Sequence, residues 1–136
     1  LEKVGAYLRF DSALDPRLSE MAILITARFW TAQYEWFAHE PHALKGGLDP
    51  AIISAIAERR RPENMKPDEE ALYDFCTELH ETHAVGDAAY RAAFDQFGER
   101  GVVELTGLIG HYTMVSMTLN AFEVEIPGGN DLPLSV

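Results

Sequence analysis

Apolar residues recur along this chain at the spacing of helix faces that pack on a core. The most apolar segment is 17–30, where Met21 through Phe29 is almost continuously apolar. Periodicity alone also allows a strand there, but the length of the segment and its Ala, Met and Leu content favour a fully buried helix. No segment gives a convincing strand signal. The expected helices are 17–30, 34–39, 51–60, 68–82, 87–98 and 101–122.

Turn and capping residues mark the ends of these segments. Asp15-Pro16 and Asp49-Pro50 each place an N-cap before a proline at the first helical position. Thr31 is a candidate N-cap for the second helix, and Pro41 is expected to limit how far that helix extends. Gly98 is expected to stop the fifth helix. Residues 1–136 are therefore predicted to form one all-α, compact bundle of about six helices.

The two ends of the chain lack a helical pattern. Residues 1–15 are expected to be an N-terminal approach, irregular from Tyr7 to Asp15. Residues 125–136 are expected to be a tail that lies on a neighbouring subunit or on the domain's own surface. The 136 residues suffice for one core, and there is no repeat.

Composition and charge narrow the possible partners. The chain is 47% hydrophobic and 24% charged, which is typical of a folded domain, and its net charge of -11 disfavours nucleic acid and anionic membranes. Its basic cluster, Arg59 to Arg61, is interpreted as cations at a helix C-terminus rather than as an anion site. The longest apolar stretch, Met21 to Ile25, is too short to cross a bilayer. We expect a cytoplasmic protein, although targeting information upstream of Leu1 would not be seen in this sequence.

The single cysteine excludes an internal dithiol. Cys76 lies near Leu72 and Leu79 on a predicted helix, so we interpret it as a small packed hydrophobe rather than as a reactive thiol. Chemistry in this chain must then rest on carboxylates and histidines.

Glu35 and His39 are four residues apart and share one helix face, where the carboxylate can orient the imidazole and raise its proton affinity. Spacing alone also allows an ordinary exposed pair. The aromatic surroundings favour a perturbed site, and Glu20 lies in a nearly apolar helix where a buried charge needs a partner. If the chain turns near 30–33, Glu20 can meet His39.

The order of these residues resembles the carboxymuconolactone decarboxylase superfamily, which includes the alkylhydroperoxidase D-like proteins. The resemblance covers most of the chain. It is carried by Leu18-Ser19-Glu20, Ala27 through His39 and Gly47-Leu48-Asp49, and then by Glu104-Leu105-Thr106, Ile109 through Thr113 and Leu119 through Phe122.

In the peroxidase branch of that superfamily, the resemblance implies a Glu, a Cys-x-x-Cys pair and a His that form a proton relay onto a dithiol. Glu20 and His39 match, but the cysteine positions fall on Ala32 and Glu35, and a family histidine falls on Tyr34. Dithiol peroxidase chemistry is therefore not expected. In the decarboxylase branch a Glu four residues before a His matches Glu35 and His39, and that branch needs no cofactor or metal.

We therefore expect acid–base chemistry, decarboxylation or isomerisation, on a small lactone or carbonyl compound. His39 would be the acid or base, with Glu35 and Glu20 as its orienting carboxylates. The resemblance also implies a homo-oligomer, a trimer or hexamer. An anionic substrate would need a cation, for which Arg9, Arg17 and Arg28 are near in sequence. The residues expected to bind substrate are Tyr34, Trp36, Trp30 and His111.

Two alternatives stay open. The chain could be a non-catalytic small-molecule binder or oligomeric scaffold, or a peroxiredoxin-type hydroperoxide reductase that uses Cys76. Asn120 is expected to be a structural hydrogen-bond partner, and His42 a loop residue. A metal site is not expected, although the i,i+3 spacing near one helix end would allow ligands from Glu78, His80, Glu81 and His83.

Overall fold

The computed structural model describes residues 1–129 and 131–136 as six α-helices and one π-helical segment, with no strand among them. The all-α prediction is confirmed. The helices are α1 (Glu2–Ala6), the π-helix η1 (Tyr7–Asp11), α2 (Pro16–Trp30), α3 (Gln33–Lys45), α4 (Pro50–Ala57), α5 (Pro67–Thr82) and α6 (Asp87–Ala121).

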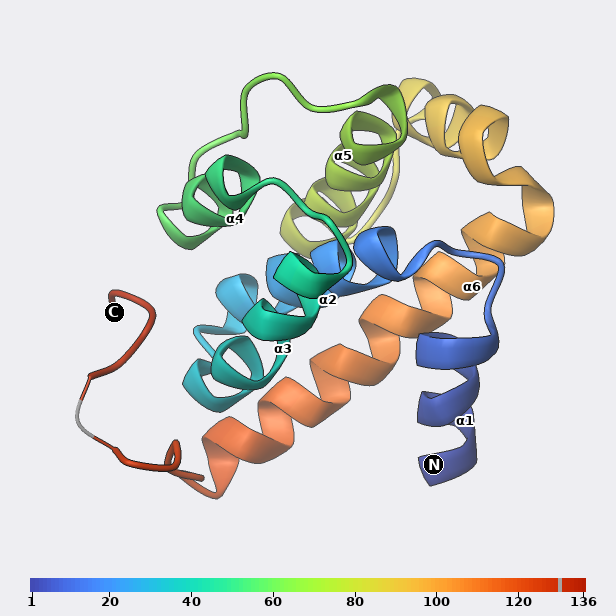
Figure 1. The fold of residues 1–136 in the computed structure, drawn as a ribbon. Coiled ribbons are helices and arrows are strands. Elements are labelled where there is room, and N and C mark those ends of the chain that lie inside the picture. Colours follow the sequence, from blue (N-terminus) through green and yellow to red (C-terminus); the bar gives the residue numbers. More distant parts are fainter. Residues whose placement is uncertain (130) are drawn as a thin grey trace.

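Helix α2 lies at the centre of the bundle (Figure 1). Every residue from Leu18 to Arg28 is buried, as the continuous apolar run predicted, and α3, α4, α5 and α6 all pack against this helix. A helix that is apolar on all sides is stable in water only when neighbours cover every side. The polar residues Glu20 and Arg28 are therefore carried into the interior by the helix on which they lie.

Proline at the first helical position starts three of the helices. Asp15 and Asp49 cap α2 and α4, and each carboxylate accepts a hydrogen bond from the backbone N–H two residues later, at 2.8 Å. Helix α5 begins at Pro67, where the side chain of Glu69 accepts from the N–H of Lys66. The predicted starts of these helices are accurate because the capping signals are local.

Two predictions around α3 were wrong. Thr31 does not cap α3; it ends α2 in a left-handed conformation, with φ 48°, and Ala32 is the N-cap of α3. Pro41 does not limit α3, which continues to Lys45. Pro41 and Phe37 are both exposed, so water can bind the Phe37 carbonyl that the proline leaves without a helical partner.

The N-terminal segment is also more ordered than predicted. Residues 2–11 are helical, and Glu104 of α6 holds them in place. Its carboxylate accepts from the Tyr7 hydroxyl and from the Ala13 backbone N–H, both at 2.6 Å, and from Arg100 Nε at 2.8 Å. The periodicity of so short a segment could not show contacts to a residue some 90 positions away.

Helix α6 contains the break that the sequence predicted. Gly98 has φ 71° and ψ 177°, so the helical path is interrupted there although the element runs from Asp87 to Ala121. No atom outside its immediate neighbours lies within 4 Å of a Cβ built at this glycine. The backbone conformation, and not a lack of space, explains the glycine.

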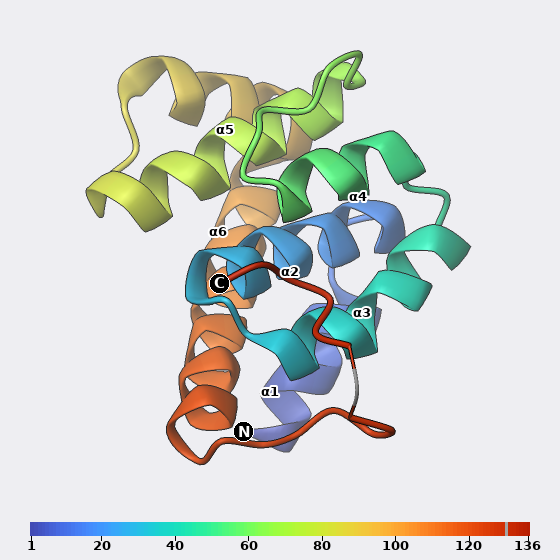
Figure 2. The ribbon, with the colours of Figure 1, turned by 90° about the vertical axis from the view of Figure 1, so that its left-hand side faces the viewer.

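The tail lies on the domain's own surface, crossing α3 and the end of α2 (Figure 2). Gln33 pairs with both backbone groups of Leu134, at 2.8 and 2.9 Å, and Leu134 is buried. Asn120, as predicted, makes a structural hydrogen bond, to the Trp30 carbonyl at 2.7 Å. Within the described residues, none of the helices has both the length and the apolar character that a bilayer crossing requires.

Candidate functional site

The turn between α2 and α3 brings three predicted site residues together. Glu20 comes from the first half of α2, and Glu35 and His39 come from consecutive turns of α3. The left-handed Thr31 lets the chain reverse, so that α3 packs back along α2. The predicted meeting of Glu20 with His39 is confirmed.

Both ring nitrogens of His39 contact carboxylates. Nδ1 lies 2.7 Å from Oε2 of Glu20, and Nε2 lies 2.8 Å from Oε1 of Glu35. The other oxygen of Glu20 accepts a hydrogen bond from Nε of Arg9 at 3.2 Å. We call this chain of four side chains, Arg9, Glu20, His39 and Glu35, the relay.

Charge within the relay is balanced. Burial by itself lowers the pKa of His39, but the contacts with Glu20 and Glu35 outweigh burial and raise its pKa above the ordinary value for histidine. A protonated His39 then donates an N–H to each carboxylate. Two anions and two cations can share a buried site where an unpaired charge would cost several kcal/mol.

Glu35 has an oxygen that the relay does not use. Its Oε2 is buried and has no hydrogen-bond partner among the described residues, whereas Oε1 contacts His39. An unsatisfied buried oxygen is costly, and native proteins tend to retain one where function needs it. Among the four relay residues as described, this oxygen is therefore a proton acceptor that no other side chain occupies.

An open cavity of about 410 Å³ lies beside the relay, between the N-terminal helix and α6. Arg9 lines it and also binds Glu20, so it connects the cavity to the relay. Tyr112 lines it as well and meets the His39 ring edge-on, with 5.2 Å between ring centroids. Burial raises the pKa of Tyr112 to about 12, so its hydroxyl stays neutral. His111, a predicted substrate contact, also lines this cavity.

The predicted aromatic wall is not formed there. Trp36 is buried in the hydrophobic core, and Trp30 lines a different cavity with Phe29 and His80. Tyr34 is half-buried near the start of α3. These aromatic residues face different ways because a helix turns successive side chains by about 100°, and only Trp36 enters the core.

Sequence reasoning named Arg9 as a candidate cation without placing it, and it missed Tyr112 as a neighbour of His39. Arg9 lies in the segment predicted to be irregular, and no local signal links it to Glu20. Of the other two candidate cations, Arg17 binds Asp68 and Glu69 instead, at 2.7 and 2.5 Å, and Arg28 lies eight residues beyond Glu20 along α2.

Thiol chemistry has no place at this site. Ala32 is buried at the start of α3, and Cys76 is fully buried in the core on α5, where burial raises the pKa of its thiol far above neutrality. A thiol that stays protonated is a poor nucleophile. The structure therefore argues against the Cys76 peroxidase alternative.

Histidines outside the relay have structural neighbours. His80 is buried, with Nε2 3.0 Å from the Thr26 hydroxyl and its ring stacked on Phe29. His42 belongs to α3 and not to a loop, with its ring 5.9 Å from that of His39. Within the described part of the chain there is no cluster of three residues that could hold a metal ion.

Comparisons with known proteins give a fold relationship. No family model matches the sequence, and no curated protein matches it. A solved structure from Agrobacterium tumefaciens, described as a protein of unknown function and a putative antioxidant defence protein AhpD, superposes with a TM-score of 0.82. The superposition covers 93% of this chain and 87% of that one, at 16% identity. The chain therefore has the alkylhydroperoxidase D-like fold.

Proposed function

We propose that this chain is an enzyme that moves a proton on a small anionic lactone or carbonyl compound without a cofactor, by decarboxylation or isomerisation. Enzymes occur in the superfamily that this fold defines, but at this identity the fold does not carry an activity with it. The observation that carries the proposal is the free Oε2 of Glu35, next to a histidine whose pKa is raised.

The geometry revises the roles expected from the sequence. Both nitrogens of His39 are occupied, so His39 is placed to hold and supply protons within the relay rather than to touch a substrate. Glu35 is the group with a free oxygen. In isomerisation, Oε2 removes a proton next to a carbonyl group and returns it to another carbon of the resulting enolate.

Decarboxylation uses the same oxygen in its acid form. The bond between the substrate carbon and its carboxylate breaks, carbon dioxide leaves, and the electron pair stays on the carbon as an enolate. The proton on Oε2 of Glu35 goes to that carbon, which leaves Glu35 as the carboxylate that pairs with protonated His39 through Oε1, and solvent supplies the proton for the next turnover. His39 in its charged form also stabilises the negative charge that develops near Glu35.

Arg9 is the cation that an anionic substrate requires. It lines the open cavity, and one of its nitrogens already neutralises Glu20. A substrate carboxylate can bind the rest of its guanidinium group. Arg9 and Tyr112 line the cavity and contact Glu20 and His39, whereas Glu35 does not line it, so the proposal requires these two side chains to move before substrate reaches Glu35.

The test is turnover of a carboxylated muconolactone, followed by release of carbon dioxide and by incorporation of solvent deuterium into the product. Glu35→Gln and His39→Gln are each expected to lower kcat by about 100-fold or more. Glu40→Gln removes a carboxylate of α3 that lies outside the relay and is expected to keep full activity. Equal turnover by all three variants would contradict the assignment.

A non-catalytic binder or scaffold is the second candidate, and the burial of the relay favours it. His39 is 6% exposed and doubly paired, which also suits a purely structural ion cluster. In that case neither carbon dioxide release nor deuterium exchange would be seen with any small lactone or 3-oxo acid. Glu35→Gln would then change only the free energy of unfolding.

We also propose that the chain forms a homo-oligomer. Leu1, Phe10 and Met114 are exposed at the rim of the cavity, and a neighbouring subunit would cover them. Light scattering at micromolar concentration tests this, and a monomer would contradict it.

A further inference from the structure

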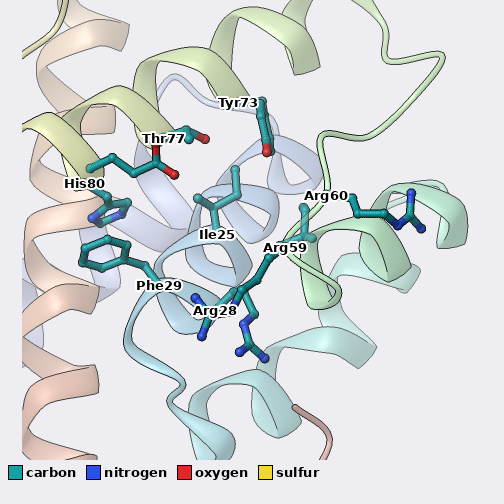
Figure 3. Close-up of a pocket in the computed structure, with 10 residues that line it drawn as sticks. Ile25, Arg28, Phe29, Arg59, Arg60, Tyr73, Thr77 and His80 are labelled. Atoms are coloured by element: carbon teal, nitrogen blue, oxygen red, sulfur yellow. The ribbon is translucent and has the colours of Figure 1, made fainter. Parts of the chain in front are cut away.

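A second cavity, of about 140 Å³, lies away from the relay, where α2, α5 and the segment that follows α4 meet (Figure 3). Arg28 lines it from α2, and Arg59 lines it from the turn that follows α4. Arg28 follows Glu20 by eight residues, which separates the two positions by about 12 Å along the helix axis. The proposed function does not use this cavity.

Arg28 is a buried cation with no counterion among the described residues. It is 4% exposed, and its Nη2 donates to the Ser135 carbonyl at 2.7 Å, but Nε and Nη1 have no hydrogen-bond partner among the described residues. No carboxylate of that part of the chain forms an ion pair with it, whereas Arg17, at the other end of α2, has two. A buried guanidinium group with unused N–H donors is costly unless an anion binds to it.

Arg59 places a second positive charge beside the first. The guanidinium groups of Arg28 and Arg59 lie next to each other, and the charge of Arg59, together with burial as the larger cause, lowers the pKa of Arg28 (Figure 3). Arg59 adopts φ 59°, and one of its nitrogens donates to the Thr31 hydroxyl. Like charges repel, so this arrangement favours binding of an anion between them.

The neighbouring arginines behave differently. Arg60 points away from Arg28 in Figure 3 and pairs with Glu58 at 2.6 Å, and Arg61 pairs with Glu70 and Asp74. The basic cluster that the sequence suggested to be helix-end cations is therefore divided. Two of its members have acidic partners, and the third faces the buried Arg28.

The remaining wall selects among anions. Ile25, Phe29 and Tyr73 give the cavity an apolar side, and its volume is close to that of cavities that hold one benzene ring. The exposed Glu81 also lines it and disfavours a dianion. A singly charged group on a small apolar body fits these features better than a free phosphate.

We propose that this cavity binds a small organic monocarboxylate, with its carboxylate on Arg28 and Arg59 and its apolar body against Ile25, Phe29 and Tyr73. Three features support this binding mode: a buried guanidinium group with unused donors, a second guanidinium group beside it and a cavity of matching size.

Benzoate is the probe, and the readout is the set of arginine Nε–Hε signals in an NMR titration of the whole chain. Benzoate is expected to shift the signals of Arg28 and Arg59 and to bind at least 10-fold more tightly than inorganic phosphate or benzyl alcohol. Arg59→Gln changes an exposed residue, so it keeps the fold, and it is expected to weaken benzoate binding at least 10-fold. Arg28→Met is expected to do the same.

Arg60→Gln is the matched control and is expected to bind benzoate as the unmodified chain does. The proposal would be overturned if benzoate shifted neither arginine signal or if phosphate bound as tightly as benzoate. It would also be overturned if Arg60→Gln weakened benzoate binding as much as Arg59→Gln. Glu35→Gln separates the two sites, because this variant is expected to bind benzoate as the unmodified chain does. Loss of benzoate binding in Glu35→Gln would place benzoate at the relay instead.

Discussion

Glu35 contacts His39 through one carboxylate oxygen, at 2.8 Å from Nε2, and keeps its second oxygen buried without a partner among the described residues. This relationship makes the pair more than the ordinary i,i+4 contact that its spacing suggests. In the proposed function, His39 holds a proton and Glu35 transfers it.

The first prediction concerns the charge state of His39. Glu35→Gln removes one of the two carboxylates that raise the pKa of His39, so this pKa is expected to fall, as measured by NMR titration of the ring signals. Glu40→Gln, on the same helix, is expected to leave it unchanged. An unchanged His39 pKa in Glu35→Gln would show that Glu20 alone sets it.

The same substitution should change how stability depends on pH. A histidine whose pKa is raised on folding stabilises the fold fully below its unfolded pKa of about 6.5, and this contribution is lost as the pH rises through the folded pKa. The difference in unfolding free energy between the unmodified chain and Glu35→Gln should therefore narrow from pH 6 to pH 9. Urea unfolding at several pH values measures it.

His80 should have the opposite effect. Burial lowers its pKa to about 4, so the neutral form stabilises the fold above about pH 6.5, and stability is lost as the pH falls toward 4. The part of the unfolding free energy that is lost because of His80 is at most about 3 kcal/mol. Phenylalanine does not titrate, so the free energy of unfolding of His80→Phe should fall less on acidification than that of the unmodified chain. His83→Asn removes an exposed histidine from the same helix end and should behave as the unmodified chain does.

Glu104 is predicted to fix the segment that carries Arg9. Glu104→Gln places an amide where three donors converge, and it should lower the free energy of unfolding by about 1 to 3 kcal/mol. Hydrogen exchange should become faster in residues 7–13. Glu99→Gln, an exposed change on the same helix, is the control, and equal exchange in both variants would argue against the role of Glu104.

Gly98 and Gly110 give a matched pair on α6. A methyl group added at either glycine would meet no atom of a non-neighbouring residue within 4 Å, but only Gly98 has a positive φ. Gly98→Ala should destabilise the fold by about 1 to 3 kcal/mol through backbone strain. Gly110→Ala, on a regular exposed helical position, should stabilise it by about 0.5 to 1 kcal/mol. Thermal unfolding of both variants is the measurement.

The amino-acid sequence by itself determined the helices and part of the relay. Asp15 and Asp49 started α2 and α4 where expected, because a cap acts within one helical turn. The spacing of Glu35 and His39 placed them on one face for the same local reason. The need of the buried Glu20 for a partner followed from the cost of an unpaired charge.

Only the tertiary structure decided which distant residues complete these sites. Arg9 contacts Glu20, Tyr112 packs on His39, and Arg59 lies beside Arg28 because separate segments of the chain pack together. No periodicity encodes such contacts. Pro41 stayed within α3, where the residue whose carbonyl loses its helical partner, Phe37, is exposed. Local interactions determined where the helices form. The burial of α2 on all sides determined how whole helices pack, and this packing placed the neighbours of each charged residue that α2 carries.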